Sequence, residues 1–229
     1  MSDSADVART AAAAAAVELV ESDMTIGLGS GRAVWKVVEL LAQRGDPVRA
    51  ATASSRTEEL ASAAGFDVVE LDGTVELDLA LDGADEVDPE LRLIKGGGGA
   101  LLREKIVVST ARRFVVVAET AKKVERLGER FRLPVEVVRF AWRDTRRRVE
   151  RLVPDPVLRL RDDGETYVTD EGHFILDCVL PADAGLDELD VSLKQVPGVV
   201  EHGLFIGLAE QALLGRPDGG VEVLERQSR

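Results

Sequence analysis

The segment LDGADEVDPELRLIKGGGGALLREK, which runs from Leu81 to Lys105, gathers side chains that can transfer protons. It contains six acidic residues and places Lys95 directly before four consecutive glycines. A carboxylate becomes an effective general base when burial raises its pKa toward neutrality. A glycine run costs conformational entropy, so it usually serves an unusual backbone conformation or a close approach by the backbone. This composition predicts a site for acid–base chemistry on a polar substrate.

Two of the acids, Asp82 and Asp85, stand where an apolar strand is expected to end. Ligands of open parallel sheets bind beyond the carboxyl ends of the strands, so we expect both aspartates in the site. Glu86, Asp88 and Glu90 fit a solvated acidic loop. A calcium loop of the EF-hand type is excluded, because no register through these acids reproduces its ligand and glycine spacing.

Glu104 lies nine residues after Lys95, in a segment with helical character. A helix glutamate is most often exposed, but the glycine run just before it favours a place in the site. The two histidines, His173 and His202, form no Ser-His-Asp or metal-ligand spacing. Cys178 lies in an apolar run and is interpreted as a core residue. The proton-transfer candidates are therefore carboxylates and one lysine, and no metal is expected.

A second motif, GLGSGRAV, extends from Gly27 to Val34 between an expected strand and an expected helix. Backbone N–H groups at such a helix start can bind a phosphate. The dinucleotide fingerprint fails because its last glycine is replaced by Arg32, and no Gly-Lys-Ser/Thr of a nucleotide-binding P-loop follows. The motif predicts a small phosphate cup with Ser30 and Arg32 as side-chain donors; a plain strand-to-helix turn is the alternative.

The elements expected to position these residues alternate between helix and strand. The expected order is a helix at 5–21, a strand at 24–29, a helix at 32–45, a strand at 48–54, a helix at 56–65, strands at 66–71 and 76–85, a helix at 100–111 and a strand at 113–119. This alternation predicts an α/β fold with a mostly parallel sheet and helices on both of its faces.

The pattern changes near residue 133. The expected elements are then a strand at 133–138, a helix at 142–153, two strands within 157–180 around an Asp-Gly turn, a helix at 187–196 and a strand at 199–205. This β-α-β-β-α-β order is typical of a ferredoxin-like α+β unit. Two further strands around a Pro-Asp-Gly-Gly turn could rejoin the first sheet. We therefore expect a larger domain of residues 1–131 and 206–229 and a smaller domain of residues 132–205.

The composition limits the possible partners. The chain of 229 residues is 45% apolar, carries a net charge of −13 and is scarce in lysine relative to arginine. Its charge repels nucleic acid and anionic lipid, and no apolar run approaches the roughly 18 residues of a membrane span. The single Cys178 fits a reducing cytoplasm, and Asp3 and Asp6 ahead of the run Ala11–Ala16 favour a helix over a signal peptide. A GC-rich genome and adaptation to high salt both fit the composition.

Five segments in chain order carry a resemblance over nearly the whole length: GLGSGRAV, LDGADEVDPELRLIKGGGGALLREKIV, AKKVERLG, LPVEVV and PGVVEHGLF. Together they resemble ribose-5-phosphate isomerase of the A type, and the second segment is the most specific. The resemblance implies interconversion of D-ribose 5-phosphate and D-ribulose 5-phosphate through an enediolate in the non-oxidative pentose phosphate pathway. It implies no metal or other cofactor, a Rossmann-like larger domain, a ferredoxin-like smaller one and a cytoplasmic homodimer or homotetramer.

The resemblance also implies roles for individual residues. Glu104 is the expected general base, Lys95 the site lysine, and Asp82 and Asp85 the paired aspartates. Because the sugar is mostly a closed ring, a second acid–base group must open it. We assign this step to Asp82, with Asp85 orienting hydroxyls or Lys95. The expected substrate-binding residues are Arg9, Ser30, Gly31, Arg32, Ala33, Gly83, Ala84, Gly96, Gly97, Gly98 and Lys122.

The phosphate loop departs from the family pattern. The usual loop is G-x-G-T-G-S-T, whereas Arg32 and Ala33 here replace its serine and threonine. Two hydroxyl donors are lost and one cation is gained. Arginine can bind a phosphate with two N–H groups, so we expect Arg32 to compensate for the lost hydroxyls.

Two other functions deserve comparison. A coenzyme A transferase subunit has a related sheet and uses a glutamate nucleophile, which would form a glutamyl thioester that hydroxylamine or borohydride can trap. A non-catalytic sugar-phosphate sensor usually carries a DNA-binding domain, and this acidic chain shows none in its sequence. The presence of both Lys95 and Glu104 favours an active site over a sensor.

Overall fold

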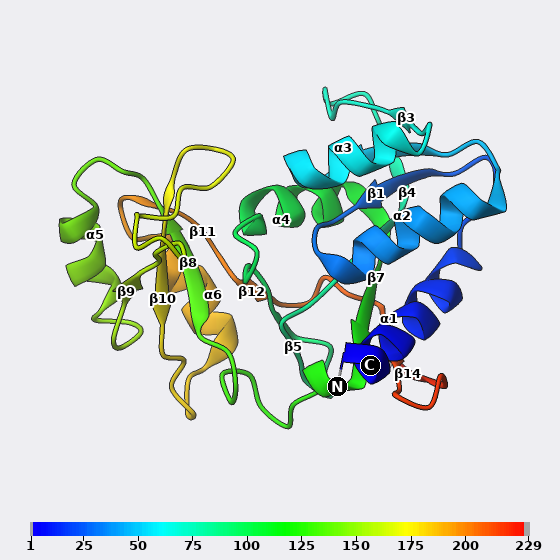
Figure 1. The fold of residues 1–229 in the computed structure, drawn as a ribbon. Coiled ribbons are helices and arrows are strands. Elements are labelled where there is room, and N and C mark those ends of the chain that lie inside the picture. The colour runs from blue at the N-terminus through cyan, green and yellow to red at the C-terminus, as the bar shows by residue number, and fades with distance from the viewer. Residues whose placement is uncertain (1, 227–229) are drawn as a thin grey trace.

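The computed structural model describes residues 2–226, which form two lobes (Figure 1). The larger lobe (residues 2–131 and 204–226) contains a seven-stranded sheet, and the smaller lobe (residues 133–202) contains a four-stranded sheet. Within the described residues, no helix has the length and apolar character needed to cross a membrane.

The seven-stranded sheet has the order β14-β13-β7-β4-β1-β2-β3. All neighbouring strands are parallel except the edge pair β13 and β14. The strands are β1 (Thr25–Leu28), β2 (Arg49–Thr52), β3 (Asp67–Val68), β4 (Leu77–Asp82), β7 (Ala111–Glu119), β13 (Gln211–Gly215) and β14 (Val221–Glu225). The prediction of a mostly parallel sheet is confirmed, and the last two strands rejoin it as expected.

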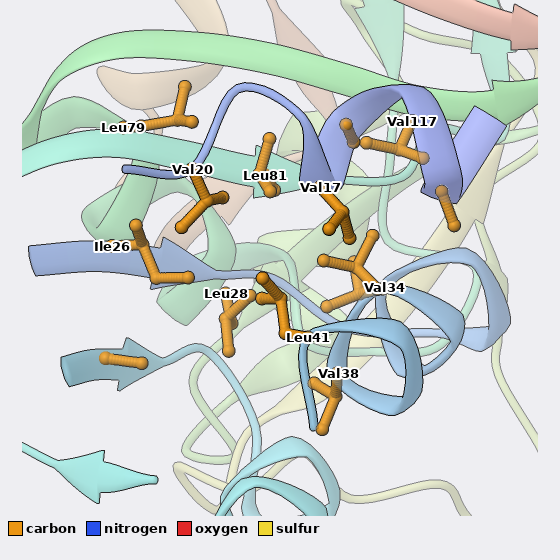
Figure 2. Close-up of a cluster of buried hydrophobic side chains, with 14 of the residues drawn as sticks. Val17, Val20, Ile26, Leu28, Val34, Val38, Leu41, Leu79, Leu81 and Val117 are labelled. Atoms are coloured by element: carbon orange, nitrogen blue, oxygen red, sulfur yellow. The ribbon is translucent and has the colours of Figure 1, made fainter. Parts of the chain in front are cut away.

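Helices cover both faces of this sheet (Figure 1). They are α1 (Ser2–Val17), α2 (Arg32–Arg44), α3 (Ser55–Ala63) and α4 (Leu101–Thr110). Successive residues of a strand point to opposite faces, so β4 contributes to two cores. Leu79 and Leu81 lie in a buried cluster with side chains of α1 and α2, which Figure 2 shows. Ala80 packs on the other face in a cluster that includes Val108 of α4.

The helix α2 follows its predicted pattern closely. Val34, Val37, Val38 and Leu41 follow the i, i+3, i+4, i+7 pattern of one helix face and are buried. The helix ends at Gly45, whose φ of 79° is left-handed and whose N–H donates to the Leu41 carbonyl. The start of α2 follows the end of β1 closely, at the position where the phosphate cup was predicted.

The smaller lobe has an antiparallel sheet of order β11-β8-β10-β9. Its elements are β8 (Leu133–Val137), α5 (Trp142–Val149), β9 (Val157–Leu158), β10 (Phe174–Cys178), α6 (Leu186–Lys194) and β11 (Val199–His202). Cys178 is buried in the core of this lobe, as expected. The predicted β-α-β-β-α-β order is confirmed. The Asp-Gly turn, however, closes only a bridge between Leu160 and Thr166 and does not join two long strands.

The expected strand at 199–205 is split at Gly203. Its second part, β12 (Leu204–Phe205), leaves the smaller sheet and pairs with β6 (Leu93–Ile94), which also pairs with β5 (Glu86–Val87). A Cβ at Gly203 would lie 2.2 Å from the Lys95 carbonyl oxygen, so only glycine fits this crossing. The chain therefore returns to the larger lobe directly beside the site lysine.

The interpretation of a solvated acidic loop is wrong for two of its three acids. Glu86 and Asp88 are buried, and only Glu90 is exposed. Glu86 accepts hydrogen bonds from the backbone N–H groups of residues 128, 130 and 131. Asp88 accepts from the backbone of Glu90 and Arg92 and pairs with the Arg92 guanidinium. These carboxylates satisfy backbone donors that burial would otherwise leave without partners.

Candidate active site

A cavity of about 280 Å³ opens at the carboxyl ends of β1, β4 and β7. Every predicted site residue lines it except Asp82. The predicted residues that line the cavity are Arg9, Ser30, Gly31, Arg32, Ala33, Gly83, Ala84, Asp85, Lys95, Gly96, Gly97, Gly98, Glu104 and Lys122. Parallel strand ends meet at one edge of the sheet, which is why segments so distant in sequence converge there.

Three charged side chains form a buried cluster at the base of the cavity. Lys95 Nζ lies 3.0 Å from Asp82 Oδ2 and 3.3 Å from Glu104 Oε1, and it donates a hydrogen bond of 2.7 Å to the Gly83 carbonyl. The side chains of Lys95, Asp82 and Glu104 are 3%, 0% and 7% exposed. One ammonium is therefore shared between two desolvated carboxylates.

The electrostatics of this cluster follow from burial and charge number. Burial, with the nearby Asp82 carboxylate, raises the pKa of Glu104 to about 8 despite the opposing effect of Lys95. Burial also raises the pKa of Asp82. For Lys95, burial would lower the pKa, but Asp82 and Glu104 outweigh it and raise the pKa above its usual value. Lys95 is thus a permanent cation, whereas Glu104 can exchange a proton near neutral pH.

The two aspartates occupy different positions. Asp82 lies behind the cavity wall, where its Oδ1 accepts hydrogen bonds from the N–H groups of Gly83 (2.7 Å) and Ser30 (3.2 Å). A Cβ at Gly29 would lie 1.9 Å from its carboxyl group, so that glycine makes room for it. Asp85 lines the cavity and accepts a 2.7 Å hydrogen bond from Gly97 N–H. Asp85, rather than Asp82, is in reach of a substrate.

The predicted phosphate cup lies at the start of α2. Gly31 precedes the helix with φ 99° and ψ 172°, a positive-φ conformation that glycine adopts readily. Arg32 is exposed at the first helical position. Ser30 is turned toward Ser54, to whose hydroxyl oxygen its own hydroxyl donates at 3.0 Å. The backbone N–H groups and the helix dipole here suit an anion.

Two cations from other elements reach the same cavity. Arg9 of α1 is 9% exposed and is held by Glu119 at 2.6 Å and by Asp6 at 3.2 Å. Lys122 belongs to the short 3₁₀ helix Thr120–Lys122 that follows β7. With Arg32, they give the mouth of the cavity three cationic side chains.

Sequence reasoning missed four lining residues: Trp35, Val117, Ala118 and Glu119. Trp35 is one helical turn after Gly31, and its backbone N–H donates to the Gly31 carbonyl. Helical spacing from Gly31 could therefore have predicted that Trp35 lies near the site. Glu119 ends β7, the neighbour of β4, so the strand-end rule also applied to it. No pattern in the sequence distinguishes Val117 and Ala118 from other residues of a buried strand.

The described residues hold no group of three or more histidine, cysteine, aspartate or glutamate side chains arranged to bind a metal ion. A mostly parallel sheet that ends in a desolvated carboxylate–lysine cluster, beside a helix start suited to an anion, indicates an enzyme that transfers protons on a small phosphorylated substrate.

Comparison with known proteins gives the family. Residues 49–219 match the model of ribose 5-phosphate isomerase A (phosphoriboisomerase A). The chain is 47% identical to ribose-5-phosphate isomerase A of Synechococcus sp. (strain JA-3-3Ab), over 98% of this chain and 99% of that protein. It is 49% identical to that of Roseiflexus castenholzii, over 94% of both. The chain therefore belongs to the ribose 5-phosphate isomerase A family.

Solved structures agree with this assignment. The ribose 5-phosphate isomerase A of Methanocaldococcus jannaschii superposes with a TM-score of 0.88 at 36% identity, covering 96% of this chain and 98% of that one. A D-ribose-5-phosphate isomerase in complex with phospho-erythronic acid gives a TM-score of 0.91 at 33% identity, covering 97% and 99%. The protein is an aldose–ketose isomerase that interconverts ribose 5-phosphate and ribulose 5-phosphate. The transferase and sensor alternatives are set aside.

Proposed function

We propose that Glu104 is the general base of the isomerisation and carries the proton between C2 and C1 of the open-chain sugar. The observation that carries this proposal is the sharing of one buried ammonium, Lys95, between Asp82 and Glu104. This arrangement leaves Glu104 with a pKa of about 8, suited to accepting and returning a proton near neutrality. One base on one face of the sugar can perform both halves of the transfer.

Lys95 and the amides of the glycine run are proposed to stabilise the enediolate. The lysine is fully charged and buried, so its field acts on the developing oxyanion with little screening by water. Each donor aimed at such an oxyanion contributes about 3 kcal/mol in comparable sites. Because Lys95 supplies the positive charge, we propose a reaction that needs no metal or cofactor.

We propose that Asp85 opens the sugar ring, in place of the assignment to Asp82 made from sequence. Asp85 borders the cavity, whereas Asp82 is enclosed by the N–H groups of Ser30 and Gly83 and by Lys95. Asp82 then acts through its neighbours, holding Lys95 in place and keeping the pKa of Glu104 high.

The phosphate is proposed to bind at the start of α2, with the backbone N–H groups there and with Arg32, Arg9 and Lys122. The hydroxyl of Ser30 is engaged with Ser54, which leaves Arg32 as the main side-chain replacement for the missing hydroxyl donors. The related structure holds phospho-erythronic acid, a phosphorylated four-carbon acid, and this supports a phosphorylated ligand at the corresponding position.

The division into two domains also remains a proposal: residues 1–131 with 206–229 and residues 132–205 were expected from sequence, and because β12 pairs with β6 we propose that Leu204 and Phe205 belong to the larger domain. A cytoplasmic homodimer or homotetramer, which follows from the family resemblance, is part of the proposal as well. Sedimentation equilibrium of the purified protein measures the assembly directly; a monomer would contradict it.

The catalytic proposal is tested by assaying ribose 5-phosphate conversion with excess EDTA and by following solvent deuterium entering the sugar. Wild-type protein should keep its rate in EDTA and exchange the C2 proton. Glu104→Gln should bind substrate without exchange. A rate abolished by EDTA, or exchange that persists in Glu104→Gln, contradicts the proposal.

A further inference from the structure

Two side chains of the smaller lobe bind the backbone carbonyl oxygens of the glycine run in the active site. Arg159 Nη1 donates to the carbonyls of Gly96 at 2.7 Å and Gly97 at 3.2 Å. Tyr167 Oη donates to the carbonyl of Gly98 at 2.9 Å. Both side chains come from the segment between β9 and β10. Three successive carbonyls of the larger lobe are thus bound by residues more than sixty positions away in the sequence.

Arg159 and Tyr167 are themselves fixed. The Arg159 side chain is 12% exposed, and its Nε and Nη2 bind the two carboxylate oxygens of Asp177. Such a two-point pair fixes the plane of the guanidinium. The guanidinium carbon also lies 5.8 Å from the centre of the Tyr167 ring. Gly99 has φ 83°, and a Cβ there would lie 2.2 Å from Tyr167 Oη, so backbone and phenol are closely fitted.

The carbonyl contacts determine where the amides point. The C=O and N–H of a trans peptide point in opposite directions, and the described residues contain no cis peptide. With its carbonyl held by Arg159, the Gly96–Gly97 peptide turns its N–H the other way, where it donates to Asp85 Oδ2 at 2.7 Å. The Gly97–Gly98 peptide, held in the same way, turns the N–H of Gly98 away from the guanidinium. Gly97 and Gly98 both line the cavity.

We propose that Arg159 and Tyr167 are positioning residues for the isomerisation. They hold the carbonyls of the glycine run away from the enediolate, so that the N–H of Gly98 faces the substrate. The N–H groups of Gly97 and Gly99 stay bound to Asp85 and to the Gly96 carbonyl, which keeps Asp85 in its orientation. This inference rests on the proposed function of the cavity and extends the site into the smaller lobe. The need is physical: a glycine run has little conformational preference of its own, and a rotated peptide would present a carbonyl oxygen to a developing anion.

The experiment compares Arg159→Met and Tyr167→Phe with Arg132→Met. Arg132 is a matched control, because it also binds two backbone carbonyls, those of Asp155 and Asp177, and one carboxylate, that of Asp155. It contacts neither the glycine run nor the Asp177 carboxylate that holds Arg159. Each folded variant is assayed for kcat and KM with ribose 5-phosphate. The dissociation constant of phospho-erythronic acid is measured as well, because, counted from the phosphate, its carboxyl carbon corresponds to C2 of the pentose and places a negatively charged oxygen where O2 of the enediolate would lie.

We expect kcat to fall about 100-fold in Arg159→Met, because small misplacements of catalytic groups have effects of this size. We expect a fall of about 10-fold in Tyr167→Phe, which removes one hydrogen bond. KM should change little, since the phosphate cup is untouched. Affinity for phospho-erythronic acid should fall in proportion to kcat/KM. Arg132→Met should retain wild-type kcat, and Arg159→Lys should recover part of the loss.

Wild-type kcat in Tyr167→Phe and Arg159→Met, or an equal loss in Arg132→Met, would overturn the proposal. Loss of kcat with unchanged affinity for phospho-erythronic acid would also overturn it, because a positioned amide must bind that carboxylate. If Arg159→Met does not fold, Tyr167→Phe decides alone, since it keeps the ring and removes only the hydroxyl. Failure of Glu104 as the base would appear separately, as turnover by Glu104→Gln with the effects of Arg159 and Tyr167 unaltered.

Discussion

Adjacent residues of α4, Glu104 and Lys105, enter two charge clusters of opposite balance: the first is buried, and the second is partly buried. In the site cluster, the carboxylates of Glu104 and Asp82 share the single ammonium of Lys95. In the second cluster, Lys105 lies 2.8 Å from Glu201, a carboxylate that a further lysine also contacts. The first cluster borders the cavity, and the second joins α4 to β11. One helix thus carries the proposed catalytic cluster and a second cluster that joins two elements of the fold.

The second cluster is fully paired. Glu201 accepts hydrogen bonds from Lys105, from Lys194 and from the N–H of His202. Burial would raise the pKa of Glu201, but the two lysines outweigh it and lower the pKa to about 2. Glu104, by contrast, shares the one ammonium of Lys95 with Asp82. Its Oε2 has no hydrogen-bond partner among the described residues. The number of cations per carboxylate therefore separates a titratable base from a fixed ion pair.

The largest expected difference between the clusters is catalytic. Glu104→Gln should lower kcat about 10³-fold, since it removes the proton acceptor while keeping the shape of the side chain. Glu201→Gln, measured on folded protein, should leave kcat near the wild-type value. Steady-state kinetics of the two variants test this directly. Comparable losses in both would mean that charge near α4, rather than the base itself, drives the reaction.

For stability, we expect the larger effect from Glu201→Gln and the smaller one from Glu104→Gln. Glu201→Gln leaves Lys105, whose side chain is 15% exposed, without its carboxylate and should reduce the free energy of unfolding by about 3 kcal/mol. Glu104→Gln should cost far less, because it relieves the crowding of two carboxylates around Lys95. Urea unfolding at pH 7 measures both. A larger loss in Glu104→Gln would show that the site cluster is held together by that carboxylate.

The pH profile tests how the site cluster raises the pKa of its base. Glu104 acts as a base only when deprotonated, so kcat/KM should rise with pH and level off above about 8. Asp82→Asn removes the neighbouring negative charge and should shift this rise to lower pH by about 1 unit. The measurement is kcat/KM from pH 5 to 10 for both proteins. A profile unchanged by Asp82→Asn would leave burial as the only cause.

The smallest effect is expected outside both clusters. Arg32→Ala should raise KM about 10-fold, because it removes a charge-assisted contact to the phosphate, and should lower kcat less. Lys36→Ala, on the same helix and paired with Glu39, is the matched control. A KM unchanged by Arg32→Ala would mean that backbone N–H groups, Arg9 and Lys122 suffice.

Much of the fold and of the site could be predicted from sequence because the signals are local. Apolar spacing and Gly45 define α2, and the end of an apolar run places Asp82 at the edge of the sheet. The prediction that Glu104 belongs to the site depended on the glycine run before it, since an isolated helix glutamate is usually exposed. The family resemblance then supplied the substrate.

What sequence could not provide depends on distant contacts. Glu86 looks like a solvated acid because its three N–H partners lie more than forty residues away. The exchange of roles that we propose between Asp82 and Asp85 depends on which carboxylate the backbone encloses. The contacts of Arg159 and Tyr167 with the glycine run join the two lobes, and no residue pattern in the sequence predicts them.

The central claim, that Glu104 is a carboxylic acid made weak by burial and by sharing one lysine, is tested most directly by NMR. Protein labelled with ¹³C at the glutamate carboxyl carbon is titrated from pH 5 to 10, beside the same titration of Glu104→Gln. We predict one carboxyl signal that titrates near pH 8 in the wild-type protein and is missing from Glu104→Gln. A Glu104 signal that has finished titrating below pH 6 would contradict the account.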